Sequence, residues 1–311
     1  MPEAGVVFFG SGSLGVPTLS ALHARGVVRV VISQPDRPAG RGLKETPTPV
    51  STWAVDHGVA LVRTKNTNEG EALYAAQNID GPLVVIAFGQ KLMPQLLMDR
   101  STVNLHPSDL PRWRGAAPIQ RAMMAGESRV GVCAMRVADR MDAGDVLDRF
   151  HVEIGEWETA SEVLDRVAVE SVPMMVRVVE QLLVGTMQGV AQNGEQATYA
   201  ANLDRSEASV SFAHPADRVR LRINGLQPWP GCVVRVQGQQ VRLLRVKSGV
   251  LSGSVGSVLA DGSIGCSQKS ILPMLVQSPG GRAIEWDAWR HGQRGLQGAH
   301  VESDFPADTP P

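Results

Sequence analysis

The sequence predicts an α/β domain with a mostly parallel sheet, followed by a smaller domain of short strands forming a barrel. Three observations carry this prediction. An apolar strand at residues 6–9 enters a glycine-rich turn and a helix from Pro17, and a second strand follows at residues 27–33. Residues 83–87 form an unbroken apolar run, typical of a central parallel strand. After Gly231, short β-rich runs alternate with glycine turns.

The remaining elements follow from periodicity and turn residues. Helices are predicted at residues 49–57, 69–76, 94–98, 117–125, 159–183 and 215–223, with Pro173 kinking the longest, and strands at residues 60–63, 102–105, 129–136 and 146–152. In the barrel, strands are predicted at residues 232–237, 240–247, 256–259, 262–266 and 271–276, with a helix at 284–290 and a frayed end at 302–311. The expected domains are residues 1–184 and 204–311, joined by a Gly-, Gln- and Asn-rich linker at 185–203.

Composition narrows the class of protein. The 311 residues are 43% hydrophobic and 20% charged, as in ordinary globular proteins. The three cysteines are widely spaced, which indicates neither a disulfide framework nor a zinc site. The start lacks a basic segment and no apolar run reaches membrane-spanning length, so we expect a cytoplasmic protein without membrane contact. No protein partner is indicated.

Charge is distributed unevenly along the chain. The net charge is −1, yet residues 204–300 contain 12 Lys and Arg against six Asp and Glu. A localised basic region favours an anionic partner such as nucleic acid. The alternative is a solvated face of a β domain.

The stretch at residues 104–120 is the leading candidate for an active site. Asn104 and His106 are two residues apart at the end of a predicted strand, so their side chains share one face. Three prolines and a glycine then stiffen a loop that contains Arg112 and Arg114. Open α/β sheets place ligands beyond the carboxyl ends of their strands.

Two loops could add to this site. Asp142 lies in the acidic loop 138–145, which follows a neighbouring predicted strand, and its carboxylate could orient His106. A Mg²⁺ or Ca²⁺ site is a weaker interpretation, because the aspartate spacing matches no EF-hand and no Walker motif accompanies it. Phe88 and Gly89, after the central strand, could form a wall for a planar ligand, although Phe88 also fits the core.

The glycine turn at residues 10–15 reads G-x-G-x-x-G and is followed by Asp36, a pattern found in NAD-binding dehydrogenases. Glycines also serve any tight turn between a strand and a helix, and Asp36 fits a loop better than a strand end. The Pro- and Gly-rich loop at 34–49 contains Arg37, Arg41 and Lys44, which could contact a phosphate backbone.

Asn104, His106 and Asp142 together favour direct acyl transfer. The amide can donate to a developing oxyanion, and an imidazole moves protons near neutral pH. No serine or cysteine partner suggests a covalent intermediate. The alternative is a buried His–Asp pair that only fixes a turn.

These residues carry a family resemblance. The run Asn-Leu-His-Pro-Ser-x-Leu-Pro at 104–111, with Asp-Ala-Gly-Asp at 142–145, resembles the folate-dependent formyltransferases. The runs at 112–121, 34–42 and 228–230 resemble the branch of that family whose acceptor is the methionine on initiator tRNA. The resemblance covers nearly the whole chain.

The resemblance implies a Rossmann-like domain with an OB-like C-terminal barrel, and 10-formyltetrahydrofolate as formyl donor without metal or NAD. It implies catalysis by Asn104, His106 and Asp142. Folate would contact Phe88, Gly89 and the segment formed by Ser108, Asp109, Leu110 and Pro111, and tRNA would contact Arg37, Arg41, Lys44 and the barrel. Asp109 stands where the family usually has leucine, and Arg140 where glycine is common.

Four other functions share part of this pattern. A nucleotide-sugar formyltransferase would use the same three residues without needing the basic domain. A glycinamide ribonucleotide formyltransferase would normally be a single domain of about 200 residues. A dehydrogenase would rest on the glycine turn alone. A non-enzymatic RNA-binding module would leave Asn104, His106 and Asp142 unexplained.

Overall fold

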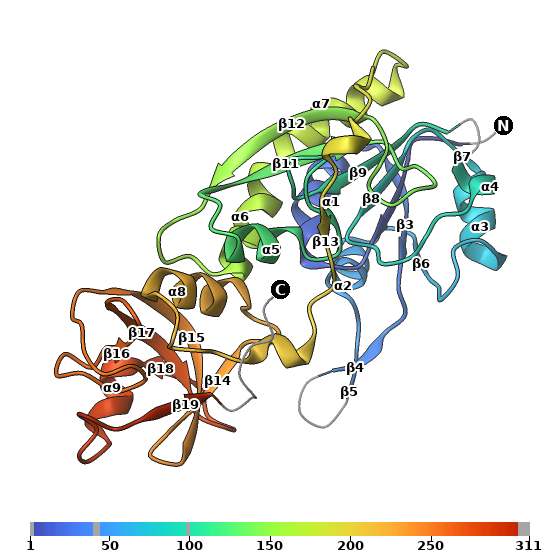
Figure 1. Cartoon of the computed structure of the whole chain (residues 1–311). Coiled ribbons are helices and arrows are strands. Elements are labelled where there is room, and N and C mark those ends of the chain that lie inside the picture. Colours follow the sequence, from blue (N-terminus) through green and yellow to red (C-terminus); the bar gives the residue numbers. More distant parts are fainter. Residues whose placement is uncertain (1–2, 40–43, 98–99, 304–311) are drawn as a thin grey trace. The chain divides into compact units, whose positions relative to one another are not determined.

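The computed structural model describes residues 3–39, 44–97 and 100–303. The chain groups into two compact units (Figure 1). The first comprises residues 1–115, 131–152 and 164–199, and the second comprises residues 116–130, 153–163 and 200–311. The second unit therefore includes two segments from earlier in the chain. Domain limits at residues 184 and 204 stay a prediction.

The first unit contains a seven-stranded sheet in the order β12-β11-β9-β8-β2-β3-β6. Its strands are β2 (Val6–Gly10), β3 (Val28–Ser33), β6 (Leu61–Arg63), β8 (Leu83–Ile86), β9 (Thr102–His106), β11 (Arg129–Met135) and β12 (Val146–Glu153). The five strands from β9 to β6 are parallel, whereas β11 is antiparallel to β9. This arrangement confirms the predicted mostly parallel sheet.

Helices cover both faces of this sheet, which explains why β2 is buried along its whole length. On one face, α3 (Gly70–Gln77) and α4 (Pro94–Leu97) pack apolar side chains around Phe9. On the other, Phe8 lies beside Gly15 at the start of α1 (Val16–His23). Helix α1 packs against α2 (Pro49–Asp56) and α7 (Val172–Leu183).

The predicted long helix at residues 159–183 is two helices, α6 (Ala160–Glu170) and α7. Pro173 lies in the first turn of α7, where its missing N–H costs nothing, so it begins a helix instead of kinking one. A capping box stands at the start of α6. The Thr159 N–H donates to Glu162 Oε2 at 2.9 Å, and the Glu162 N–H donates to Thr159 Oγ1 at 3.4 Å.

The segment expected to be an irregular loop at 34–49 contains a hairpin of β4 (Arg37–Ala39) and β5 (Lys44–Thr46). Its glycines and Pro38 concealed these strands in the sequence. Arg41 lies outside the described residues. The shorter elements of the first unit are β1 (Glu3–Ala4), paired with β7 (Ile79–Asp80), β10 (Arg114–Gly115), paired with β13 (Tyr199–Ala200), and the 3₁₀ turns η1 (Ser13–Gly15) and η2 (Gly194–Gln196).

The second unit contains an antiparallel, barrel-like sheet in the order β16-β17-β15-β14-β19, with β18 paired to β17. The elements are α5 (Pro118–Met124), η3 (Arg205–Ala208), α8 (Ala216–Gly225), β14 (Cys232–Val236), β15 (Gln239–Gly249), β16 (Ile264–Gly265), β17 (Ser270–Gln277), β18 (Ala283–Glu285), α9 (Trp286–His291) and β19 (Val301–Ser303). Irregular pairing between β15 and β17 at Arg245 helps the sheet curve.

Three predictions for this unit were wrong in detail. Residues 256–259 form only isolated bridges at Ser257 and Val258. The predicted helix at 284–290 is divided between β18 and α9. Residues 302 and 303, expected to be frayed, belong to β19, which pairs with β14. Strand β19 lies at the edge of the sheet, and its pairing with β14 supplies backbone hydrogen bonds that the local sequence pattern does not indicate.

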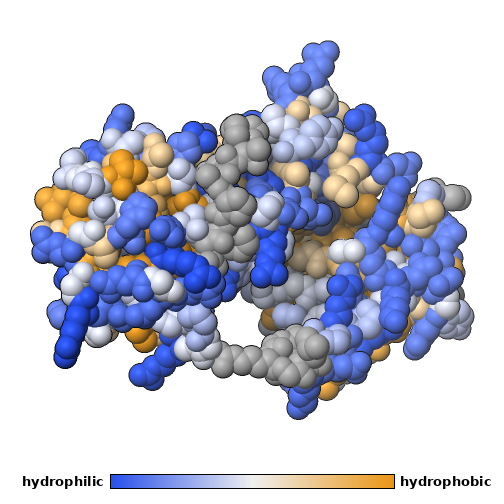
Figure 2. Space-filling view, turned by 60° about the horizontal axis from the view of Figure 1, so that its bottom comes forward, coloured by the Kyte–Doolittle hydropathy of each residue, from blue (hydrophilic) through white to orange (hydrophobic). Residues whose placement is uncertain are grey.

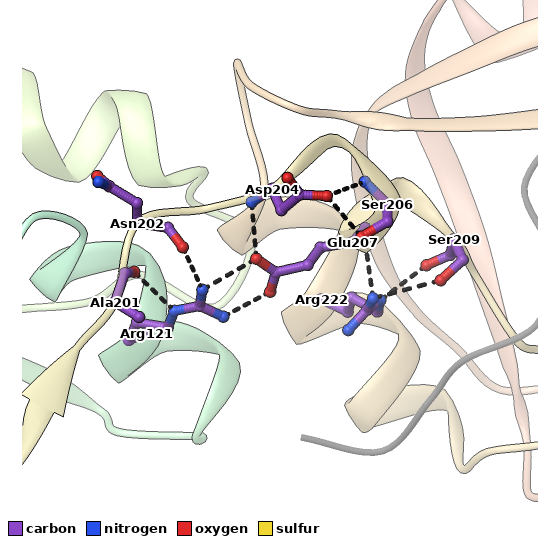
Figure 3. Close-up of polar contacts among 8 residues, drawn as sticks. All are labelled: Arg121, Ala201, Asn202, Asp204, Ser206, Glu207, Ser209 and Arg222. Atoms are coloured by element: carbon purple, nitrogen blue, oxygen red, sulfur yellow. Dashed lines mark hydrogen bonds and ion pairs between the residues drawn. The ribbon is translucent and has the colours of Figure 1, made fainter.

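A polar network joins α5 to η3 and to the segment before it (Figure 3). The Arg121 guanidinium donates to both carboxylate oxygens of Glu207, at 2.5 and 2.9 Å. It also donates to the carbonyls of Ala201 and Asn202, at 3.2 and 2.9 Å. The Asp204 N–H donates to Glu207 Oε1 at 2.8 Å. One carboxylate thus fixes three segments of the second unit.

In the part of the chain that the structure describes, no helix is both long enough and apolar enough to span a bilayer. The face drawn in Figure 2 is mostly hydrophilic, with smaller hydrophobic patches.

The Glu207 network predicts a pH dependence of stability. Burial alone would raise the pKa of Glu207, but the hydrogen bond from Arg121, the Asp204 N–H and the charges of Arg121 and Arg222 outweigh it and lower the pKa below 4.5. The folded state then binds fewer protons than the unfolded state, so the free energy of unfolding contains an increment present above pH 4.5 and lost as the pH falls through the lowered pKa.

We therefore expect Glu207→Gln to lower the free energy of unfolding by about 1–2 kcal/mol at pH 7. The difference from the wild type should shrink in urea titrations between about pH 5 and pH 3. Glu195→Gln, at an exposed carboxylate, is the control and should follow the wild type. A difference for Glu207→Gln that does not change with pH would contradict the ionic role.

Candidate active site

The carboxyl ends of β2, β3, β8 and β9 meet at one edge of the parallel sheet, where such folds bind ligands. Side chains that follow β2 and β3 contact the backbone that follows β8. Ser11 Oγ donates to the Phe88 carbonyl at 3.3 Å, and Gln34 Nε2 donates to the same oxygen at 2.7 Å. Gly89 has a φ of +76°, and a Cβ there would lie 2.7 Å from Gln34 Nε2. The left-handed backbone at this position favours glycine, and a side chain there would also displace the Gln34 amide.

The Phe88 ring is 2% exposed and packs edge to face with Phe9, with ring centroids 5.5 Å apart. Phe88 therefore lies in the core, which was the alternative role predicted for it. Contact of Phe88 and Gly89 with a ligand stays a prediction.

The glycine turn is explained by packing within the fold. A Cβ at Gly10 would lie 2.7 Å from the Phe8 ring, and one at Gly12 would lie 3.0 Å from the Cβ of Ala87. Asp36 pairs with Arg63, with Oδ1 3.0 Å from Nε. These contacts give Gly10, Gly12 and Asp36 structural roles within the fold.

Asn104 and His106 lie on β9 as predicted. The Asn104 side chain is half-buried, and its amide has no hydrogen-bond partner among the described residues. His106 is 5% exposed, and its Nε2 lies 3.0 Å from the Trp113 carbonyl. Because a carbonyl only accepts, Nε2 is the donor in this contact. Nδ1 faces Asp142, 3.7 Å from its Oδ2.

Asp142 reaches the site from the loop between β11 and β12, as the sequence predicted. Its backbone has a φ of +51°, which is uncommon for a residue with a side chain. Its Oδ2 accepts a hydrogen bond from the Gly115 N–H at 2.8 Å, and its side chain is 13% exposed. The loop that follows β9 thus holds the carboxylate facing His106.

Sequence reasoning missed two residues that support Asp142. Gln192 Nε2 donates to the carbonyls of Asp142 and Gly144, at 2.9 and 2.7 Å. Its Oε1 accepts from Arg114 Nη2 at 2.8 Å, and Arg114 is 4% exposed. Gln192 lies in the stretch assigned as a linker, so no local pattern marked it. The buried Arg114 marks this support, but its burial appears only in the structure, so the sequence held no signal for Gln192.

The loop after His106 is closed by its own hydrogen bonds. Ser108 Oγ donates to the Arg112 carbonyl at 2.8 Å, and the Arg112 N–H donates to the Asp109 carbonyl at 3.0 Å. Leu110 is fully buried in a cluster with Cys133, Met135 and Val146. Burial raises the pKa of the Cys133 thiol to about 11, so this sulfur stays protonated and unreactive.

The remaining predicted residues lie on the hairpin. Arg37 and Lys44 are exposed on β4 and β5, and Arg37 donates to Gln34 Oε1. Within residues 3–39, 44–97 and 100–303, no group of three or more His, Cys, Asp or Glu side chains could hold a metal ion.

Two family models match the chain in order. The model described as formyl transferase matches residues 4–179, and the model described as formyl transferase, C-terminal domain, matches residues 202–294. Curated relatives named methionyl-tRNA formyltransferase align over nearly their whole length. The relative from Ruegeria pomeroyi is 37% identical over 295 residues, covering 92% of this chain and 96% of the relative. The relative from Jannaschia sp. is 36% identical over 304 residues, covering 96% and 99%.

Solved structures share the fold. HypX from Aquifex aeolicus, solved with tetrahydrofolic acid, has a TM-score of 0.65 and 18% identity, and the match covers 94% of this chain and 48% of HypX. Methionyl-tRNA formyltransferase from Clostridium thermocellum has a TM-score of 0.58 and 14% identity, covering 91% and 99%. At these identities the likeness shows the fold alone. The family matches and the curated relatives together confirm the predicted resemblance: the chain belongs to the formyl transferase family.

Proposed function

We propose that this enzyme transfers the formyl group of 10-formyltetrahydrofolate to the amino group of methionyl initiator tRNA. The observation that carries the proposal is the grouping of Asn104, His106 and Asp142 at the carboxyl edge of the sheet. The names of the curated relatives support methionyl-tRNA as acceptor. The tetrahydrofolate bound by HypX supports a folate donor.

The chemistry follows from what each side chain can donate or accept. The methionyl amine attacks the formyl carbon, and the carbonyl oxygen gains negative charge. The Asn104 amide, which has no partner among the described residues, donates to that oxygen. The His106–Asp142 pair takes the proton released by the amine and returns it to the departing folate nitrogen. The new C–N bond forms as the old one breaks, without a formyl-enzyme.

The 108–112 loop fits a folate donor. It lies directly after His106, and its hydrogen bonds and buried Leu110 give it one conformation. Ser108 to Pro111 would border the donor, while Arg37, Arg41, Lys44 and the basic region after residue 204 would contact the tRNA.

Single-turnover transfer tests the function and the role of His106 together. The wild type should formylate methionylated initiator tRNA, with methionylated elongator tRNA as the control acceptor. His106→Ala should slow the step by about 100-fold to 10,000-fold because the proton path is lost. Near-normal transfer by His106→Ala would remove that assignment. Transfer to a dTDP-amino sugar, but not to methionyl-tRNA, would replace the proposed acceptor.

Gln192 should matter for kcat although it is remote from Asn104 in sequence. Gln192→Leu removes both hydrogen bonds to the Asp142 loop and leaves Arg114 without its acceptor. We expect kcat to fall by about 10- to 100-fold with a smaller change in KM, since the carboxylate is misplaced. Gln188→Leu, at an exposed glutamine of the same segment, is the control. A lower melting temperature with unchanged kcat would make the role of Gln192 structural only.

Substitutions in the β4–β5 hairpin should affect the KM for the tRNA acceptor and not the KM for the folate donor. Replacing both Arg37 and Lys44 with alanine should raise KM for methionyl-tRNA several-fold and flatten its salt dependence, because two phosphate contacts are lost. KM for the folate donor should stay unchanged. Lys65→Ala removes an exposed lysine elsewhere in the first unit and serves as the control. An equal rise in KM for both substrates would rule out a specific tRNA contact.

A further inference from the structure

Asp109 lies directly on strand β11 with no side chain between them. The residue beneath it is Gly131, where a Cβ would lie 2.4 Å from the Asp109 Cβ and 2.5 Å from its Cα and its backbone nitrogen. Any other residue at 131 would therefore move the backbone of the 108–112 loop. A glycine inside a strand commonly marks such a close approach of another segment.

Strand β12 holds the Asp109 carboxylate from the side. Arg149 and His151 are two residues apart on β12 and share one face. Arg149 Nη1 donates to Asp109 Oδ1 at 3.1 Å, and His151 Nε2 lies 3.7 Å from Oδ2. Two strands that are far from residue 109 in sequence thus fix its backbone and its side chain.

The same guanidinium also holds the backbone of the loop. Arg149 Nη1 donates to the Leu110 carbonyl at 3.2 Å, while the Leu110 side chain is fully buried. Beyond this point the chain turns back, and the Trp113 carbonyl accepts the hydrogen bond from His106. Asp109 and Leu110 therefore connect strands β11 and β12 to the segment whose Trp113 carbonyl accepts from His106.

We propose that Asp109 and Arg149 are positioning residues that set the height of the 108–112 loop above β11 and so place Ser108 and Pro111 against the formyl donor. This inference rests on the proposed function, in which that loop borders the folate. Asp109 acts through the loop, and its carboxylate is directed to Arg149 and His151 rather than to the donor.

The solvent exposure of Asp109 and Arg149 distinguishes a positioning role from a contribution to global stability. The Asp109 and Arg149 side chains are 37% and 43% exposed, and ion pairs so close to solvent contribute little to global stability. Their removal should therefore change the local geometry of the loop and leave the folded state intact.

Steady-state kinetics of Asp109→Asn and Arg149→Met test the proposal. Each variant should raise KM for 10-formyltetrahydrofolate by about 5- to 20-fold, with kcat within about twofold of the wild type and KM for methionyl-tRNA unchanged. The double variant should raise the donor KM by less than the product of the two single effects, because both substitutions remove the Asp109–Arg149 ion pair. Unchanged KM for the donor in both single variants would overturn the proposal.

Arg177→Met is the matched control. Arg177 on α7 pairs with Asp148 on β12, the strand that contains Arg149, and its Nη2 lies 2.5 Å from Asp148 Oδ2. This pair has no described contact with the 108–112 loop. The control should leave the donor KM unchanged. An equal rise in the control would assign the effect to β12 as a whole and overturn the proposal.

Amide hydrogen exchange gives a readout that does not depend on activity. The Ser108 and Arg112 N–H groups donate to the His106 and Asp109 carbonyls, at 2.9 and 3.0 Å. Both should exchange about tenfold faster in Asp109→Asn and Arg149→Met than in the wild type or Arg177→Met. If the wild type transfers no formyl group to any acceptor, the proposed function fails and exchange alone decides: faster exchange supports the positioning role, and unchanged exchange overturns it.

Discussion

The site depends on one constraint, which is that the loop leaving β9 must return to it. Residues 107–115 leave His106, and their end supplies the Trp113 carbonyl to the imidazole and the Gly115 N–H to Asp142. One short segment therefore holds both the histidine and the carboxylate. A change in the path of this loop would displace the acceptor of His106 and the donor to the Asp142 carboxylate together, while Gln192 holds only the backbone of the Asp142 loop.

The hydrogen bonds divide the work among the three candidate residues. His106 has an acceptor at Nε2 and a carboxylate 3.7 Å from Nδ1, so its ring is fixed on both sides. Asn104 differs, since the described residues leave its amide without a partner. An amide that is half-buried and uncommitted, beside a fixed histidine, is suited to a substrate oxygen. This geometry supports the proposal that charge develops near Asn104 and a proton moves near His106.

The sequence predicted the parts of the site that local patterns encode. Asn104 and His106 were predicted together because a two-residue spacing on a strand places side chains on one face, and Asp142 because its loop follows a strand expected beside theirs. In the structure β11 is antiparallel to β9, so the loop after β11 must return along the sheet to bring Asp142 to His106. Gln192 could not be found in this way, since its contacts with Asp142 and Gly144 span about 50 residues and its segment has no periodicity. The same limit explains the missed hairpin at β4 and β5 and the strand β19, whose pairing partners the sequence does not name.

Two glycines near the site allow one backbone segment to lie directly against another. Gly144 lies in the predicted loop at 138–145, and Gly131 lies in the predicted strand at 129–136. In the structure, a Cβ at Gly144 would lie 2.0 Å from the Arg136 carbonyl, and one at Gly131 would overlap Asp109. Both act as spacers that let one backbone lie against another, beside Asp142 in one case and beneath the 108–112 loop in the other. Gly131 is the more telling, because a glycine within an apolar strand costs stability unless another segment must approach it. Gly131 therefore makes room on β11 for the backbone of Asp109, and the 108–112 loop can lie against the strand only because that position has no side chain.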